Sequence, residues 1–120
     1  MKILICGSRY YKDFQKIRDY LKNLKQQTKE KITVIEGGAK GADILARKSC
    51  KELEIEFKEY KANWKKYGKY AGPKRNQKML DDNPDIKKVV AFHEDLEKSK
   101  GTKNMIKKAK KKNIKVETYK

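Results

Sequence analysis

Four short motifs combine glycine, hydroxyl and basic residues in a way that suits the binding of a phosphate group. They are Cys6-Gly7-Ser8-Arg9, Gly37-Gly38-Ala39-Lys40-Gly41-Ala42-Asp43, Ala71-Gly72-Pro73-Lys74-Arg75-Asn76 and Ser99-Lys100-Gly101-Thr102. Small residues at the start of a helix leave backbone N–H groups uncovered, and such groups bind anions. The planar fork of arginine matches phosphate oxygens. A helix cap or a tight turn explains any one motif, but four together, two with arginine, indicate a phosphate site.

Aromatic and acidic residues near these motifs would complete a nucleotide site. Trp64, Tyr67 and Tyr70 precede the third motif, and their rings could stack on a base. Trp64 is the best candidate for that role, whereas Tyr67 and Tyr70 fit a packed surface loop equally well. Asp43 could meet the hydroxyls of a ribose, or could instead complement the dipole of the helix that follows it.

Three side chains near the same turns are candidates for acid–base catalysis. His93 carries an imidazole that can transfer protons, and Glu36 and Asp43 are carboxylates beside the second motif; Glu94 is a further carboxylate close by. A histidine without a role in a polar loop is the simpler interpretation of His93. The second motif has neither the spacing of a dinucleotide fingerprint nor that of a P-loop. No group of residues has the spacing of metal ligands, and we expect neither a metal nor a cofactor.

Short apolar runs alternate with amphipathic segments along the whole chain. The runs predict five strands, over residues 2–6, 32–36, 55–60, 86–92 and 113–118. Between them the spacing predicts helices that begin near Asp13, around Asp43, at Ala71 and at Thr102, with loops over 61–70 and 93–101. Asp13 can cap the first helix.

Strands that alternate with helices in this way pair in parallel and place helices on both faces of a sheet. We therefore expect an α/β protein, a Rossmann-like three-layer α/β/α sandwich with a mainly parallel five-stranded sheet. In such sheets ligands bind beyond the carboxyl ends of the strands. All four motifs lie at those ends.

The length and composition of the chain limit the classes of protein to which it can belong. The chain has 120 residues, which fits one domain over 1–120. Its apolar runs are too short to span a bilayer and its first residues enter a strand at once, so we expect a cytoplasmic protein without membrane contact. Cys6 and Cys50 lack the spacing of a disulfide framework or a zinc site. The net charge of +17 would attract polyanions, and a general lysine bias explains it equally well.

The ordered set of GSR, GGAKGAD, the aromatic segment leading into AGPKRN, and SKGT resembles the SLOG superfamily, in particular its small YspA-type (cpYpsA-related) members. It is also similar to the Smf/DNA-processing-protein-A fold, where such turns occur in the same order. The resemblance implies a Rossmann-like fold that binds nucleotides or nucleotide-derived signals, and pairing into homodimers. The matching positions are Gly7, Ser8, Arg9, Gly37, Gly38, Gly41, Asp43, Arg75, Asn76, Ser99, Gly101 and Thr102.

These observations leave three functions open. The leading one is binding of a small nucleotide or nucleotide-derived ligand, with Arg9 and Arg75 neutralising phosphate. The second is binding of single-stranded nucleic acid along a basic surface. The third is hydrolysis of a nucleotide, since the superfamily contains Lonely-guy-type phosphoribohydrolases. Their PGGxGTxxE signature is missing here, because GGAKGAD has no glutamate at the matching place.

Overall fold

The computed structural model describes residues 1–120 and contains all five predicted strands. The strands are β1 (Lys2–Gly7), β2 (Thr33–Glu36), β3 (Glu56–Glu59), β4 (Ile86–Phe92) and β5 (Lys115–Tyr119). The helices are α1 (Phe14–Gln27), α2 (Ala42–Leu53), α3 (Trp64–Tyr67), α4 (Ala71–Asp82) and α5 (Gly101–Lys111). Two short 3-10 turns, η1 (Gly68–Tyr70) and η2 (Leu96–Lys98), complete the chain.

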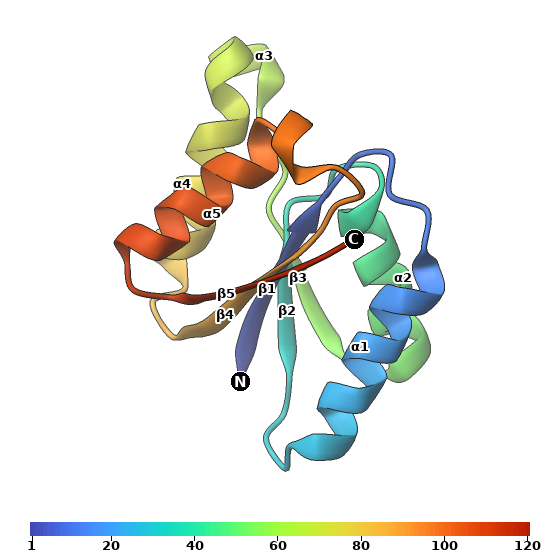
Figure 1. Cartoon of the computed structure of the whole chain (residues 1–120). Coiled ribbons are helices and arrows are strands. Elements are labelled where there is room, and N and C mark those ends of the chain that lie inside the picture. Colours follow the sequence, from blue (N-terminus) through green and yellow to red (C-terminus); the bar gives the residue numbers. More distant parts are fainter.

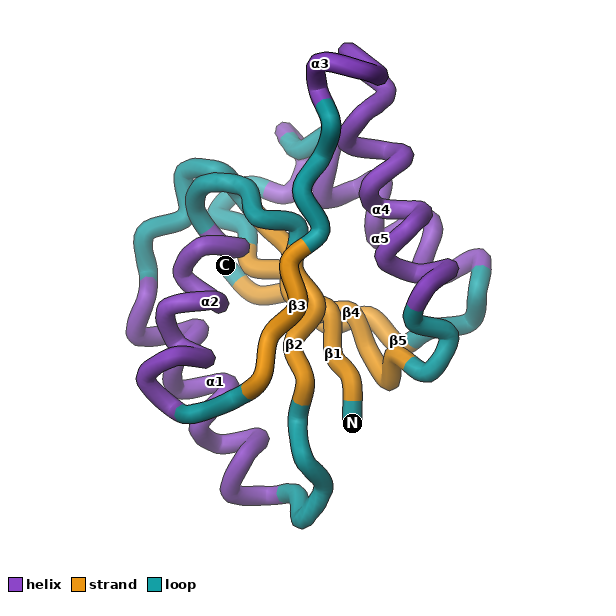
Figure 2. The backbone as a smooth tube through the Cα atoms, turned by 180° about the vertical axis from the view of Figure 1, so that it is seen from behind, coloured by secondary structure: helices purple, strands orange, loops and turns teal.

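The five strands form one sheet in the order β3-β2-β1-β4-β5, and every neighbouring pair is parallel. Helices α1 and α2 cover one face of the sheet, and α4 and α5 cover the other (Figure 1). The view from behind shows the same two helix pairs flanking the strands (Figure 2). The predicted Rossmann-like three-layer fold is confirmed, with a sheet that is wholly rather than mainly parallel.

The strand order reverses between β1 and β4. The chain runs from β1 outward through β2 to β3, and then returns to the other side of β1 to form β4 and β5. The register pairs Ile3 with Lys88 and continues to Gly7 with Phe92, so β1 and β4 end at the same level. Ligands of parallel sheets bind beyond the strands at such a reversal. The fold therefore brings together the loops that follow β1 and β4.

Alternate side chains of the inner strands build a hydrophobic core on each face. Ile3 and Ile5 of β1 pack in one cluster with Leu21 of α1, whereas Leu4 packs in the other with Leu80 of α4. All five are fully buried. This alternation follows from the two-residue period of a strand. Each such side chain contributes about 1.5–3 kcal/mol by leaving water, and so fixes the helices that carry the motifs.

The prediction of a loop over residues 61–70 is wrong, because this segment forms α3 and η1. In Figure 1 it projects beyond the end of the sheet. The side chain of Asn63 caps α3 by accepting a hydrogen bond from the Lys66 N–H at 3.1 Å. Gly68 ends the helix at φ +53°, a conformation that glycine adopts without strain. A helix of one turn is too short to show a hydrophobic period in the sequence.

Other predicted boundaries differ only slightly from the observed ones. Asn113 adopts the left-handed conformation, with φ +59°, and β5 therefore begins later, at Lys115. Asp13 caps α1 as predicted, since its carboxylate accepts a hydrogen bond from the Lys16 N–H at 3.1 Å. No helix of this protein combines the length and the apolar character needed to cross a membrane.

Candidate functional site

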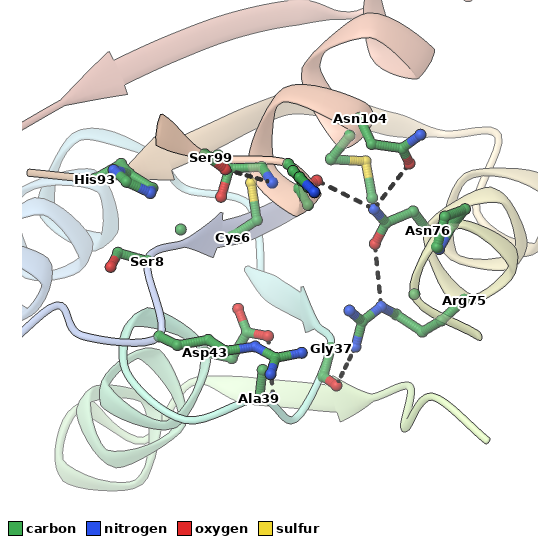
Figure 3. Close-up of a pocket in the computed structure, with 18 of the residues that line it drawn as sticks. Cys6, Ser8, Gly37, Ala39, Asp43, Arg75, Asn76, His93, Ser99 and Asn104 are labelled. Atoms are coloured by element: carbon green, nitrogen blue, oxygen red, sulfur yellow. Dashed lines mark hydrogen bonds between the residues drawn. The ribbon is translucent and has the colours of Figure 1, made fainter. Parts of the chain in front are cut away.

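A cavity of about 730 Å³ opens beyond the carboxyl ends of β1, β2 and β4. Its walls are the end of β1, the segments that follow these strands, and residues of α3, α4 and α5. In Figure 3, Ser8 and His93 lie on one side of the cavity, and Arg75 and Asn76 of α4 on the other. The volume is typical of small-molecule sites, and the position is the reversal of strand order.

The structure brings most of the predicted ligand-binding residues to this cavity. Those that line it are Gly7, Ser8, Arg9, Gly37, Ala39, Asp43, Trp64, Gly72, Arg75, Asn76, Ser99, Gly101 and Thr102. Gly38 lines a smaller adjoining cavity instead. Gly41 and Ala42 line neither cavity, so they act on the site through packing.

Gly41 holds the start of α2 close to the loop that follows β1. It has φ +80°, and a Cβ atom there would overlap the carbonyl of Ser8 and lie 2.6 Å from the carbonyl carbon of Arg9. The next N–H, that of Ala42, donates to the Ser8 carbonyl at 3.0 Å. Only glycine allows this close approach. The contact fixes the direction in which α2 presents Asp43 to the cavity.

Hydrogen bonds fix Arg75 and Asn76 at the start of α4. Arg75 donates from Nη1 to the Gly37 carbonyl at 2.6 Å and from Nε to the Asn76 side chain at 3.0 Å. Asn76 in turn donates to Oδ1 of Asn104 at 3.1 Å (Figure 3). Burial lowers the pKa of Arg75, and the Asp43 carboxylate opposes that effect. One network therefore links the β2 turn, α4 and α5, with an oriented guanidinium at its centre.

Asp43 is a buried carboxyl group in the cavity wall, with 7% of the residue exposed. Its Oδ2 accepts a hydrogen bond from the Ala39 N–H at 3.1 Å. Burial raises the pKa of Asp43 to about 7, although this hydrogen bond and the nearby Arg75 charge both lower it. Near neutral pH both protonation forms are populated, so the group can either donate or accept a hydrogen bond.

The glycine turn after β2 does not leave all its N–H groups uncovered. Gly38 donates to the Glu36 carboxylate at 2.5 Å, and Ala39 donates to Asp43. Glu36 is fully buried, is bound by Arg47 at 3.0 Å and does not line the cavity. It is therefore not placed for acid–base chemistry on a ligand. An anion at this turn depends on side-chain cations rather than on these two N–H groups.

Arg9 and Trp64 meet at the cavity from distant parts of the chain. The guanidinium carbon of Arg9 lies 5.5 Å from the centroid of the Trp64 ring, and both residues line the cavity. Trp64 is 49% exposed, so its ring is accessible to a ligand. Tyr67 and Tyr70 do not line the cavity.

Ser8 joins the loop after β1 to the loop after β4. Its hydroxyl donates to Glu94 Oε1 at 2.7 Å and accepts from the Tyr10 N–H at 3.0 Å. The Ser8 hydrogen bond lowers the pKa of Glu94. His93 lines the cavity, and its Nδ1 accepts a hydrogen bond from the Asp95 N–H at 2.9 Å. In the neutral ring Nε2 therefore carries the proton.

The last predicted motif is both a helix cap and a wall of the cavity. The Ser99 hydroxyl accepts a hydrogen bond from the Thr102 N–H at 2.9 Å, at the start of α5. A Cβ atom on Gly101 would meet nothing within 4 Å, so this glycine leaves space open beside the helix N-terminus. No group of three or more His, Cys, Asp or Glu side chains lies close enough together to hold a metal ion.

Sequence reasoning did not assign several of the residues that line the cavity. They are Cys6, Tyr10, Lys69, Pro73, Met79, Asp95, Lys98, Lys100, Asn104 and Met105, whereas Glu94, which also lines the cavity, was expected near it. Helical spacing could have identified two of them, because Asn104 lies one turn after Gly101 and Met79 lies one turn after Arg75. The loop residues carry no comparable signal.

Comparison with known proteins supports the family resemblance that the sequence motifs indicate. A family model described as the YspA, cpYpsA-related SLOG family matches residues 1–67. The chain belongs to this family. It is also similar to the Gene 61 protein of Mycobacterium phage D29, with 31% identity over 120 residues, 96% of this chain and 93% of the phage protein. The SLOG match covers Arg9, the glycine turn and Trp64, and confirms the YspA-type resemblance. Membership indicates a nucleotide-related function in general.

Proposed function

We propose that the cavity binds a nucleotide or a nucleotide-derived signalling molecule through its phosphate. The observation that carries the proposal is that Arg9 and Arg75 line one cavity and neither forms a salt bridge. The other two arginines of the chain, Arg18 and Arg47, are paired with carboxylates. Unpaired guanidinium groups at a cavity suit an anionic ligand, because they form strong charge-assisted hydrogen bonds with phosphate.

Two further residues bind the ribose and the base of the nucleotide. Asp43, at the start of α2, meets the ribose hydroxyls, which its two protonation forms can serve as acceptor or donor. Trp64 covers the base. Arg9 lies over the Trp64 ring. When Arg9 turns toward a phosphate, that ring face becomes available for stacking.

Isothermal titration calorimetry tests the proposal. A thermal-shift panel of mononucleotides, dinucleotides, cyclic nucleotides and ADP-ribose derivatives first selects the compound to titrate. Arg9→Ala and Arg75→Ala should each weaken its binding by about 1.5–3 kcal/mol, the range for charged hydrogen bonds. Arg18→Ala is the control, because it removes the same charge from an exposed pair with Glu52 on another surface. Unchanged affinity in both site variants would show that the phosphate has been placed wrongly.

Hydrolysis of the bound nucleotide is a second candidate function, favoured by the position of Asp43. A carboxyl group with a pKa of about 7 beside a cavity suits a general acid or base. Incubation of the protein with the selected compound, followed by chromatography, tests this function. Product that forms with the wild-type protein and not with Asp43→Asn supports turnover. If the compound binds and no product forms, the protein binds the nucleotide without hydrolysing it.

Binding of single-stranded nucleic acid is tested by the same panel. An oligonucleotide is included at low and at physiological salt, because contacts with phosphates weaken steeply as salt rises. Stabilisation by the oligonucleotide alone, lost at physiological salt, would favour a basic surface over the cavity. Stabilisation by one small nucleotide at both salt concentrations supports the cavity.

A further inference from the structure

A second cavity, of about 370 Å³, adjoins the larger one. The two share five lining residues, which are Arg9, Gly37, Ala39, Trp64 and Arg75. The residues found only in the smaller cavity are Gly38, Lys40, Lys61 and Ala62. The two arginines and the tryptophan therefore stand at the junction of two compartments. A ligand bound between the arginines reaches both.

The smaller cavity is lined by cations without a carboxylate. Arg9, Lys40, Lys61 and Arg75 contribute four positive charges. The larger cavity differs, since Asp43, Glu94 and Asp95 are among its lining residues. Arg9 adds to the effect of burial in lowering the pKa of Arg75, so the two guanidinium groups repel each other when nothing lies between them.

The carboxylates that flank the smaller cavity are engaged elsewhere. Glu36 accepts a hydrogen bond from the Gly38 N–H, Glu59 lies beside Gly38, and both carboxylates are bound by Arg47 of α2. Lys61 lies 3.8 Å from Glu59, at the long end of an ion pair, with 77% of its side chain exposed. The cationic lining thus keeps most of its charge available for a ligand.

We propose that the smaller cavity holds the distal phosphates of a nucleoside 5′-diphosphate or 5′-triphosphate whose nucleoside occupies the larger cavity. Arg9 and Arg75 bind the phosphate nearest the ribose, and Lys40 and Lys61 bind the next. A second nucleoside in this place would bury cations without an opposing charge, which is unfavourable. The inference rests on the proposed nucleotide function and adds that the ligand carries two or more phosphates in a row.

Titration of AMP, ADP and ATP, in a buffer with EDTA, tests the inference. The wild-type protein should bind ADP or ATP about tenfold or more tightly than AMP, since each charged contact contributes more than ~1.4 kcal/mol. The double variant Lys40→Gln/Lys61→Gln should bind AMP as tightly as the wild type does. It should lose most of the preference for ADP or ATP over AMP. Lys110→Gln/Lys111→Gln is the control, because it removes the same charge from exposed positions at the end of α5.

The outcomes separate this inference from the proposed function. If AMP, ADP and ATP bind equally well, or if the double variant keeps the full gain, the second compartment does not hold phosphate and the nucleotide cavity stands. If no nucleotide binds, the proposed function fails as well. Adenosine 3′,5′-bisphosphate carries two phosphates on opposite sides of the ribose, and a lysine-dependent gain with it instead of ADP would overturn the linear arrangement. Inorganic tripolyphosphate that binds as tightly as ATP would show that the nucleoside contributes nothing.

Discussion

Replacing Asp43 with asparagine should change how the stability of the protein depends on pH. The wild-type carboxyl group is buried, and burial raises its pKa from the ordinary value of 3.8 to about 7. Between these two pH values the folded protein holds a proton that the unfolded chain has released. The free energy of unfolding therefore falls as pH rises from about 4 to about 7, and then levels off. At about 1.36 kcal/mol for each pH unit, the loss amounts to ~4 kcal/mol.

The amide of Asp43→Asn does not titrate, and its oxygen can still accept the Ala39 N–H bond. Urea unfolding of both proteins at pH 4.5, 6 and 8.5 measures the effect. The variant should gain ~3 kcal/mol relative to the wild type between pH 4.5 and 8.5, because about 2.5 pH units of the titration fall inside that range. Asp85→Asn is the control, because a hydrogen bond from Lys2 lowers the pKa of Asp85 and this group is therefore ionised in both the folded and the unfolded protein over the same pH range, so its variant should follow the pH dependence of the wild type. Parallel stability curves for wild type and Asp43→Asn would refute the assignment of a buried, mostly protonated carboxyl group.

Two pairs of matched substitutions, one of glycines and one of aspartates, test the backbone contacts that hold the elements around the cavity. Gly41→Ala should cost more than about 2 kcal/mol in urea unfolding, since the residue has φ +80° and its Cβ would overlap backbone, whereas Gly101→Ala should cost nothing because that position is open. Equal stabilities of these two variants would contradict the close approach of α2 to the β1 loop. Asp13→Ala should destabilise the protein by about 1 kcal/mol through loss of the α1 cap, and Asp19→Ala in the exposed middle of α1 by less.

The sequence predicted the sheet well because the strands carry clear physical signals. Ile3-Leu4-Ile5 and Val89-Val90-Ala91 are apolar runs of the length of a strand that is buried on both faces. The alternation of these runs with amphipathic helices predicts that the strands pair in parallel. The short helix α3 was missed because its single turn depends on the cap from Asn63, which a turn or a loop would use equally well.

The candidate site was predicted less completely than the fold. Glycine and arginine turns at strand ends identified most of the cavity, since topology alone brings those ends together. The direction of a single side chain was not predictable. Glu36 lies at the end of β2 and turns toward Arg47, eleven residues later, instead of toward the cavity. Its partner becomes evident only when α2 is packed on the sheet, and the same holds for the bond from Ser8 to Glu94.

About half of the residues that line the cavity belong to connecting segments, whereas the two hydrophobic cores lie between the sheet and the helices on its two faces. Substitutions or insertions in residues 8–11, 37–41, 61–70 and 93–100 change the shape and charge of the cavity and leave the strand register intact. A lineage with this scaffold can therefore alter its ligand through loop evolution while α2 and α4 keep Asp43 and Arg75 in place. Chimaeras that swap these loops between relatives should retain the fold of the recipient.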